Sequence, residues 1–129
     1  MNLNDYFSSV EGTGILATSD DQGNVNTAVY ATPHVIDDKT IAFIMRPRRS
    51  LANLQSNPKA AFLFMEKKEG YHGKRFTLEK CGQEDDLKKV NLLRRSHHGG
   101  DEEKALLVYF KVTSVRPLVG DVEKQSTAL

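Results

Sequence analysis

The sequence has little of several features that whole classes of proteins require. It contains a single cysteine, Cys81, so an intramolecular disulfide is impossible and a disulfide-rich secreted scaffold is excluded. Its net charge is only +1, so no strong electrostatic field favours nucleic acid or an acidic membrane surface as a partner. The longest apolar stretches, such as residues 60–65, are far too short to span a bilayer. We therefore expect neither a nucleic acid nor a membrane partner.

The length and composition of the chain are those of a small globular protein. The first four residues carry no cationic segment of a signal peptide, which together with the lone cysteine predicts a cytoplasmic protein. A chain of 129 residues, 39% apolar and 27% charged, suits one domain with its own core. We assign this domain to residues 1–120 and expect residues 121–129 to form a flexible tail, because they have little to bury.

Alternating apolar and polar residues predict a mainly β protein. Turn residues such as Asp20-Asp21-Gln22-Gly23 separate the alternating segments, which favours hairpins and excludes a doubly wound parallel sheet. Six or seven such strands with few helices indicate a closed or nearly closed antiparallel barrel. The predicted strands cover residues 13–19, 24–32, 34–36, 40–46, 60–65, 74–81 and 105–115.

Three short helices are predicted from apolar spacing and from the residues at their ends. The first covers residues 3–11, with Asn4 or Asp5 as its cap. The second covers residues 50–57, with Ser50 as its cap and Pro58 after its end. The third covers residues 83–95, where leucine and valine recur with amphipathic spacing.

The segment Arg46-Pro47-Arg48-Arg49-Ser50 is the most informative stretch. Three guanidinium groups precede a predicted helix start, where the helix dipole is already positive, so cations there are unfavourable unless an anion arrives. A phosphate would accept hydrogen bonds from free backbone N–H groups, from the Ser50 hydroxyl and from the arginines. A solvated loop whose arginines pair with scattered carboxylates explains the segment equally well on charge alone.

The strand predicted over residues 24–32 could supply a second wall to such a site. Its odd-numbered residues from Val25 to Ala31 face one way, and its even-numbered residues from Asn26 to Thr32 face the other. Asn26 and Thr27 offer polar side chains and the strand backbone could line an aromatic ring. Without further information, ordinary alternation in a half-exposed strand remains the simpler explanation.

The order of several motifs resembles a known family. A strand Gly14-Ile15-Leu16-Ala17-Thr18, a glycine turn and Val25-Asn26-Thr27 come first. A strand that ends at Arg46, the basic loop, Asn57-Pro58 and an apolar strand follow. In this order residues 14–65 resemble the FMN-binding split-barrel family related to pyridoxamine 5'-phosphate oxidase, and the second half of the chain matches more loosely. The resemblance implies a six-stranded antiparallel split β-barrel with a few short helices, which forms a homodimer with flavin at the interface.

The resemblance also implies which residues hold FMN. The phosphate would lie at the basic loop, which agrees with the charge argument and favours the phosphate site over the solvated loop. Residues 120–129 lack the segment with arginine and histidine that grips the substrate phosphate in true pyridoxamine phosphate oxidases, so the resemblance does not extend to vitamin B6 oxidation. The implied FMN contacts are Asn26, Thr27, Ala28, Val29 and Tyr30 at the ring, Ile44, Met45 and Arg46 beside the ribityl chain, and Arg48, Arg49 and Ser50 at the phosphate, with Asn53 nearby.

These observations together predict a flavoprotein. The expected function is an oxidoreductase that acts on a small molecule or a redox partner, with FMN supplying the chemistry. A flavin carrier or electron-transfer protein without a substrate of its own is an alternative, and so is a relative that binds haem or a deazaflavin. The sequence identifies no catalytic acid or base.

Cys81, His97 and His98 are predicted to be dispensable. Adjacent histidines cannot easily point at one metal ion, no further ligand stands at the required spacing, and Cys81 lacks an activating partner in the sequence, so no metal site is expected. Alanine at each position should leave the flavin content of the purified protein unchanged, as measured by absorbance. Loss of bound flavin in either histidine variant would show that this loop takes part in binding.

Overall fold

The structure is a computed structural model, and it describes residues 1–85, 90, 105–120 and 124–125. Within these residues the chain is mainly β, as predicted. The described elements are α1 (Leu3–Ser9), β1 (Gly12–Ser19), β2 (Val25–Tyr30), β3 (His34–Asp37), β4 (Thr40–Met45), α2 (Arg49–Ser56), β5 (Lys59–Glu66), β6 (Gly73–Glu84), β7 (Leu106–Pro117) and β8 (Lys124–Gln125).

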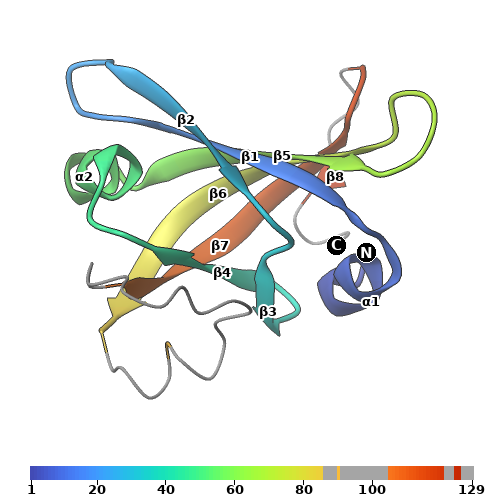
Figure 1. Ribbon diagram of the computed structural model, residues 1–129, viewed down its shortest axis with the longest axis horizontal. Helices are drawn as coiled ribbons and strands as arrows, with labels where there is room; N and C mark the ends of the chain where they lie inside the picture. Colours follow the sequence, from blue (N-terminus) through green and yellow to red (C-terminus); the bar gives the residue numbers. More distant parts are fainter. Residues whose placement is uncertain (86–89, 91–104, 121–123, 126–129) are drawn as a thin grey trace, which may run out of the picture.

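All paired strands are antiparallel and belong to one strongly curved sheet (Figure 1). Its order is β2-β1-β5-β6-β7-β4-β3, and the short β8 pairs with β7. The described sheet does not close, because β2 and β3 form its two edges although they follow each other in the chain. The predicted antiparallel split barrel is confirmed. The six strands that the resemblance implies are fewer than those described, because the path through the sheet has seven strands, including the four-residue β3 that the sequence predicted near residues 34–36, and β8 adds a short eighth.

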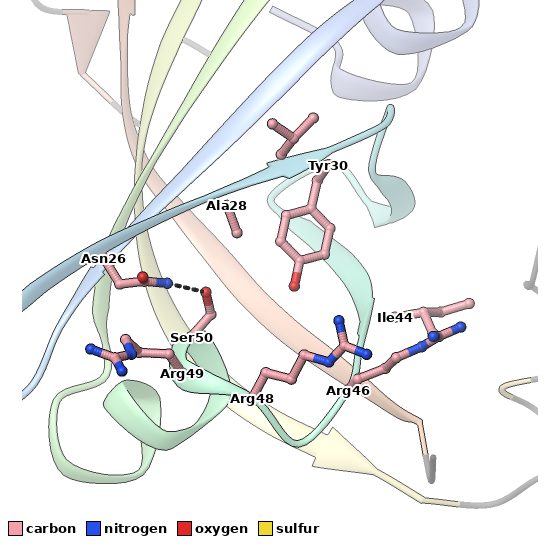
Figure 2. Close-up of a pocket in the computed structure, with 9 residues that line it drawn as sticks. Asn26, Ala28, Tyr30, Ile44, Arg46, Arg48, Arg49 and Ser50 are labelled. Atoms are coloured by element: carbon pink, nitrogen blue, oxygen red, sulfur yellow. Dashed lines mark hydrogen bonds between the residues drawn. The ribbon is translucent and has the colours of Figure 1, made fainter. Parts of the chain in front are cut away.

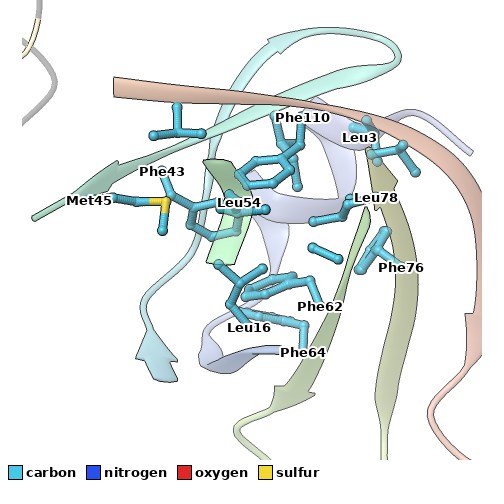
Figure 3. Close-up of a cluster of buried hydrophobic side chains, with 14 of the residues drawn as sticks. Leu3, Leu16, Phe43, Met45, Leu54, Phe62, Phe64, Phe76, Leu78 and Phe110 are labelled. Carbon is cyan, nitrogen blue, oxygen red and sulfur yellow. The ribbon is translucent and has the colours of Figure 1, made fainter. Parts of the chain in front are cut away.

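The hydrophobic core lies inside the curved sheet, and phenylalanine side chains are prominent in it (Figure 3). Phe62 and Phe64 are fully buried and alternate along β5 with exposed or half-buried residues, and Phe76 of β6 and Phe110 of β7 belong to the same cluster. Full burial of one such side chain contributes about 1.5–3 kcal/mol. The strands therefore gain their stability largely from this cluster.

The two helices cover opposite ends of the sheet (Figure 1). Leu3 and Phe7 of α1 join the core, and the Phe7 ring lies 5.3 Å from the Phe64 ring between centroids. Leu51 and Leu54 of α2 join the same cluster from the other end. Each helix is short, so its position depends on this buried face rather than on helix propensity.

A close approach at Gly14 shapes the side of the barrel near the sheet edge. A β-carbon at Gly14 would lie 2.2 Å from Cζ of Phe62 and 3.0 Å from the carbonyl oxygen of Tyr30. Glycine therefore allows the Phe62 ring to lie across β1 while β2 stays in register, with Gly14 opposite Tyr30.

β6 is longer than the sequence predicted. It continues to Glu84, so Gln83 and Glu84 pair with β7 and do not begin a helix. The pairing persists beyond an irregularity between Lys80 and Gly82, because the neighbouring strand offers hydrogen bonds that local amphipathic spacing does not reveal. The rest of the helix predicted over residues 83–95 lies outside the described residues, except Asp85 and the helical, buried Val90.

The ends of the chain differ in detail from the predicted ones. Asn2 caps α1, since its Oδ1 accepts a hydrogen bond from the Asp5 backbone N–H at 3.1 Å, so neither Asn4 nor Asp5 is the cap. In the segment 121–129, Lys124 and Gln125 pair with Val115 and Ser114 of β7. The remainder of that segment lies outside the described residues, and the domain boundary at residue 120 stays a prediction.

Candidate functional site

A pocket of about 510 Å³ opens between β2, β4 and the start of α2 (Figure 2). It lies where the sheet is split, between the edge strand β2 and the far side of the barrel. Its volume falls within the range of about 300–1,000 Å³ that is usual for small-molecule sites. The nine lining residues are Asn26, Ala28, Val29, Tyr30, Ile44, Arg46, Arg48, Arg49 and Ser50.

β2 provides one wall of the pocket through its alternation. Asn26, Ala28 and Tyr30 are half-buried on its inner face, whereas Val25 and Thr27 are exposed on its outer face. The Tyr30 ring packs edge-on against Phe43 of β4, with centroids 5.1 Å apart. This contact holds β2 across from β4 where no sheet hydrogen bonds join them, since β2 pairs only with β1 in the described sheet.

The start of α2 provides the floor. Arg48 is the N-cap, with extended backbone and no side-chain cap, and the first turn of α2 contains no acidic residue. Ser50 is the second helical residue, so the prediction that it caps the helix is wrong. A tight turn, in which the Arg48 N–H donates to the Arg46 carbonyl at 2.7 Å, brings the chain into the helix before Ser50.

Ser50 is instead tied to β2. Its Oγ accepts a hydrogen bond from Nδ2 of Asn26 at 3.1 Å (Figure 2). Both groups line the pocket, and the hydroxyl of Ser50 keeps a proton that it can donate to a ligand. The bond therefore fixes two polar groups beside the helix N-terminus, where the backbone already favours an anion.

The pocket is strongly positive. Arg46, Arg48 and Arg49 line it, and none of the lining residues that the structure describes is acidic. Figure 2 shows Arg49 near Ser50 and Asn26, Arg48 reaching toward the Tyr30 hydroxyl, and Arg46 beside Ile44. The charge is thus spread along the floor and is suited to a ligand with negative groups.

Tyr30 adds a neutral donor between these cations. Burial raises the pKa of its hydroxyl, and the positive charge of Arg48 offsets part of that rise. The hydroxyl therefore stays protonated at neutral pH and can donate a hydrogen bond into the pocket.

All nine lining residues were among those predicted for FMN, and three predicted residues lie elsewhere. Thr27 is exposed on the outer face of β2 and does not line the pocket, although Val29 on the same face does. Met45 is 1% exposed and belongs to the hydrophobic core. Asn53 is buried in α2, where its Nδ2 donates to Oγ1 of Thr18 at 3.1 Å, so it positions the helix rather than lining the pocket.

Thr18 is a residue that the sequence did not single out. It is 3% exposed, lies on β1 and anchors α2 through Asn53. The sequence did not indicate this role, because Thr18 fits the regular alternation of β1 and its hydrogen-bond partner is distant in the chain.

Other candidates stay apart from the pocket. Cys81 is exposed on β6 and does not line it, and His97 and His98 lie outside the described residues. Among the residues that the structure describes, no group of three or more histidine, cysteine or acidic side chains is placed to hold a metal ion. None of the described helices is both long enough and apolar enough to cross a membrane.

A family model described as pyridoxamine 5'-phosphate oxidase matches residues 5–112, which is most of the chain. The chain belongs to this family. The match extends from α1 to the middle of β7 and so includes every residue that lines the pocket. No curated protein matches the sequence significantly.

Solved structures share the fold of this pyridoxamine 5'-phosphate oxidase family member at low identity. An FMN-binding protein from Syntrophomonas wolfei subsp. wolfei is 20% identical over 90% of this chain and 83% of its own, with a TM-score of 0.72. An F420 reductase is 16% identical over 83% of this chain and 89% of its own, with a TM-score of 0.63. A haem-binding protein from Mycobacterium smegmatis is 12% identical over 98% of this chain and 58% of its own, with a TM-score of 0.67.

We predict that Asn53→Ala destabilises the protein by about 1–3 kcal/mol, because it leaves the buried Thr18 hydroxyl without its partner. Urea unfolding should show a lower midpoint with an unchanged slope. Gln55→Ala, which removes the same kind of amide from the exposed face of α2, is the control and should change stability by less than about 0.5 kcal/mol. Equal effects of the two variants would contradict an anchoring role for Asn53.

Proposed function

We propose that this protein binds FMN in the pocket between β2, β4 and α2 and acts as an oxidoreductase on a small molecule or a redox partner. The observation that carries the proposal is the convergence of three arginines, Ser50 and the N-terminus of α2 on one pocket. Family membership and the shared fold of an FMN-binding protein support it. We also propose a cytoplasmic location, which suits a protein with one cysteine.

The phosphate fits the end of the pocket near Arg49. Ser50 and Asn26 are held together there by a hydrogen bond, and Arg49 is exposed at the start of α2. The first helical backbone bond joins the Ala52 N–H to the Arg48 carbonyl at 3.0 Å, so the N–H groups of Arg49, Ser50 and Leu51 have no acceptor within the helix. An anionic phosphate would satisfy them and would remove the unfavourable interaction between the arginines and the helix dipole.

The flavin ring fits along the inner face of β2. Ala28 is small and leaves room between Asn26 and Tyr30, while Ile44 offers an apolar surface from β4. β2 is an edge strand, so backbone N–H and C=O groups on its free side are not used by the described sheet. Such groups can pair with the polar edge of an isoalloxazine ring.

Bound FMN would supply the transfer of electrons, and the chain supplies binding and access. Arg49, Ser50 and the helix N-terminus orient the cofactor, and Asn53 holds that helix in place through Thr18. Tyr30 presents a protonated hydroxyl to the pocket. A carrier protein would need only the residues that bind the cofactor, whereas an enzyme must also turn over a substrate. Steady NAD(P)H oxidation by the pure holoprotein therefore separates an enzyme from a carrier.

Haem or a deazaflavin is the alternative occupant, since family relatives of known structure are named for haem and for F420. Among the described lining residues, Tyr30 is of a type that can ligate haem iron, whereas histidine, cysteine and methionine are absent from them. The three arginines, Ser50 and the N-terminus of α2 are the features that favour a phosphate-bearing cofactor. The absorbance spectrum of the purified protein distinguishes a flavin from a haem or a deazaflavin.

Arg49→Ala is predicted to weaken FMN binding by about tenfold to a hundredfold, because a charge-assisted contact to phosphate contributes roughly 1.5–3 kcal/mol. Riboflavin lacks the phosphate, so its affinity should barely change. Fluorescence-quenching titrations of both ligands on both proteins measure the difference. Lys39→Ala, at the exposed turn before β4, is the control for the loss of one positive charge.

Two results would count against this assignment of Arg49. Equal loss of affinity for FMN and riboflavin would mean that Arg49 acts through the ring or through folding. No loss for either ligand would remove the phosphate site from the start of α2.

We also propose that the protein is a homodimer, with a second copy covering the outer face of β1, β2 and β5. Ile15 of β1 stands between Val29 of β2 and Leu63 of β5 in the strand register. Val29 is 73% exposed, and Val25 on the same strand is 80% exposed. An apolar sheet face of this kind usually marks an interface, and Val29 also lines the pocket, so a second copy there would border the site.

The dimer proposal predicts twice the monomer mass by light scattering at micromolar concentration with flavin bound. Ile15→Glu should shift the protein toward the monomer, because a charge would be buried at the interface. Ile36→Glu, at an exposed apolar residue of β3, should leave the mass unchanged. A monomeric wild-type holoprotein would refute the dimer.

A further inference from the structure

Two side-chain hydrogen bonds join α2 to the first two strands in a reciprocal pattern. From the helix, Nδ2 of Asn53 donates to Oγ1 of Thr18 on β1 at 3.1 Å. From β2, Nδ2 of Asn26 donates to Oγ of Ser50 on the helix at 3.1 Å. Thr18 and Asn26 are direct partners in the register of β1 and β2, so they lie on one face of the sheet. Ser50 and Asn53 are three residues apart and therefore share one face of α2.

The two bonds differ in their relation to the pocket. Thr18 is 3% exposed and Asn53 is 7% exposed, and neither lines the pocket. Asn26 and Ser50 both line it, and Asn26 is only half-buried. The inner bond and the apolar face of α2 thus hold the helix independently of the pocket. The effect of Asn26 on a ligand can therefore be separated from the position of the helix.

The bond from Asn26 restricts the direction of the Ser50 proton. A serine hydroxyl has one proton and two lone pairs. Because the Asn26 amide donates to Oγ, it occupies one lone pair, and the hydroxyl proton points toward a different acceptor (Figure 2). The first backbone N–H groups of α2 also lack an acceptor within the helix, so the hydroxyl and the backbone favour the same anion.

We propose that Asn26 is a positioning residue, which orients the Ser50 hydroxyl toward the cofactor phosphate and thereby contributes to the selection of FMN over riboflavin. The inference rests on the proposed function, since it concerns the phosphate end of the same pocket. It also changes the role of Asn26, which the family resemblance placed at the flavin ring.

The test is a double-mutant cycle in which fluorescence quenching measures the Kd of FMN and the Kd of riboflavin. Ser50→Ala should raise the Kd of FMN by about tenfold or more, because a hydrogen bond to a charged group is lost. Asn26→Ala should raise it by about three- to tenfold, since the hydroxyl remains but is no longer oriented. The double variant should resemble Ser50→Ala within about twofold, because Asn26 acts through that hydroxyl. The Kd of riboflavin should stay within about twofold of wild type throughout.

Two further variants control for indirect effects. Thr27→Ala changes the next residue of β2, which is exposed on the outer face and does not line the pocket, and should leave both Kd values unchanged. Asn53→Ala breaks the inner bond and should lower the urea midpoint more than Asn26→Ala does, because the Thr18 hydroxyl is buried whereas Asn26 is half-buried.

The outcomes separate this inference from the proposed function. Equal loss of FMN and riboflavin affinity in Asn26→Ala would overturn the inference, because Asn26 would then act at the ring or through folding. Additive losses in the cycle would also overturn it, since Asn26 would then act without Ser50. An unchanged Kd of FMN in Asn26→Ala would overturn it as well. Failure of the wild type to bind FMN would overturn the proposed function, and the inference with it.

Discussion

The contact between Tyr30 and Phe43 joins two strands that the sheet itself leaves apart. β2 is one edge of the described sheet and β4 lies next to the other edge, yet the two rings meet with centroids 5.1 Å apart. Phe43 in turn packs against Phe62 and Phe110 in the centre of the core. These rings therefore connect the core to the wall of the pocket, because Tyr30 both contacts Phe43 and lines the pocket.

The aromatic rings of the core also require a residue without a side chain at one position of β1. Gly14 leaves room for the Phe62 ring, and its register partner is Tyr30, so the same small residue serves both the core and the wall of the pocket. α2 is held at the open end by Leu51 and Leu54 in the core and by the buried bond from Asn53 to Thr18. Apolar packing thus positions a helix whose N-terminus faces the pocket with positive charge.

Arginines gather at the end of α2 where the helix dipole is unfavourable to cations, and the first turn of α2 contains no acidic residue. This placement supports the proposed phosphate site, because a bound anion would be favoured by both the arginines and the helix N-terminus. Arg48 and Arg49 leave this end of the helix in different directions (Figure 2).

Local patterns in the sequence determined the positions of most strands and one wall of the pocket. Alternation placed the strands within a few residues and assigned Asn26, Ala28 and Tyr30 to one face of β2, because side-chain direction in a strand has a period of two residues. The basic segment before a helix indicated an anion site, because charge and helix dipole act over a few residues. The resemblance to the family then selected all nine described residues of the pocket.

The tertiary structure decided what depends on neighbours that are distant in the sequence. Pairing with β7 extends β6 through Gln83 and Glu84, although their local spacing favoured a helix, since hydrogen bonds from an adjacent strand outweigh weak local propensity. Met45 is buried in the core, and the side-chain amide of Asn53 donates its hydrogen bond to Thr18. Met45 and Asn53, both predicted to contact FMN, therefore lie outside the pocket. Only the tertiary structure could show that Arg48 reaches toward Tyr30, because folding brings β2 opposite the start of α2 although the two segments are distant in the sequence.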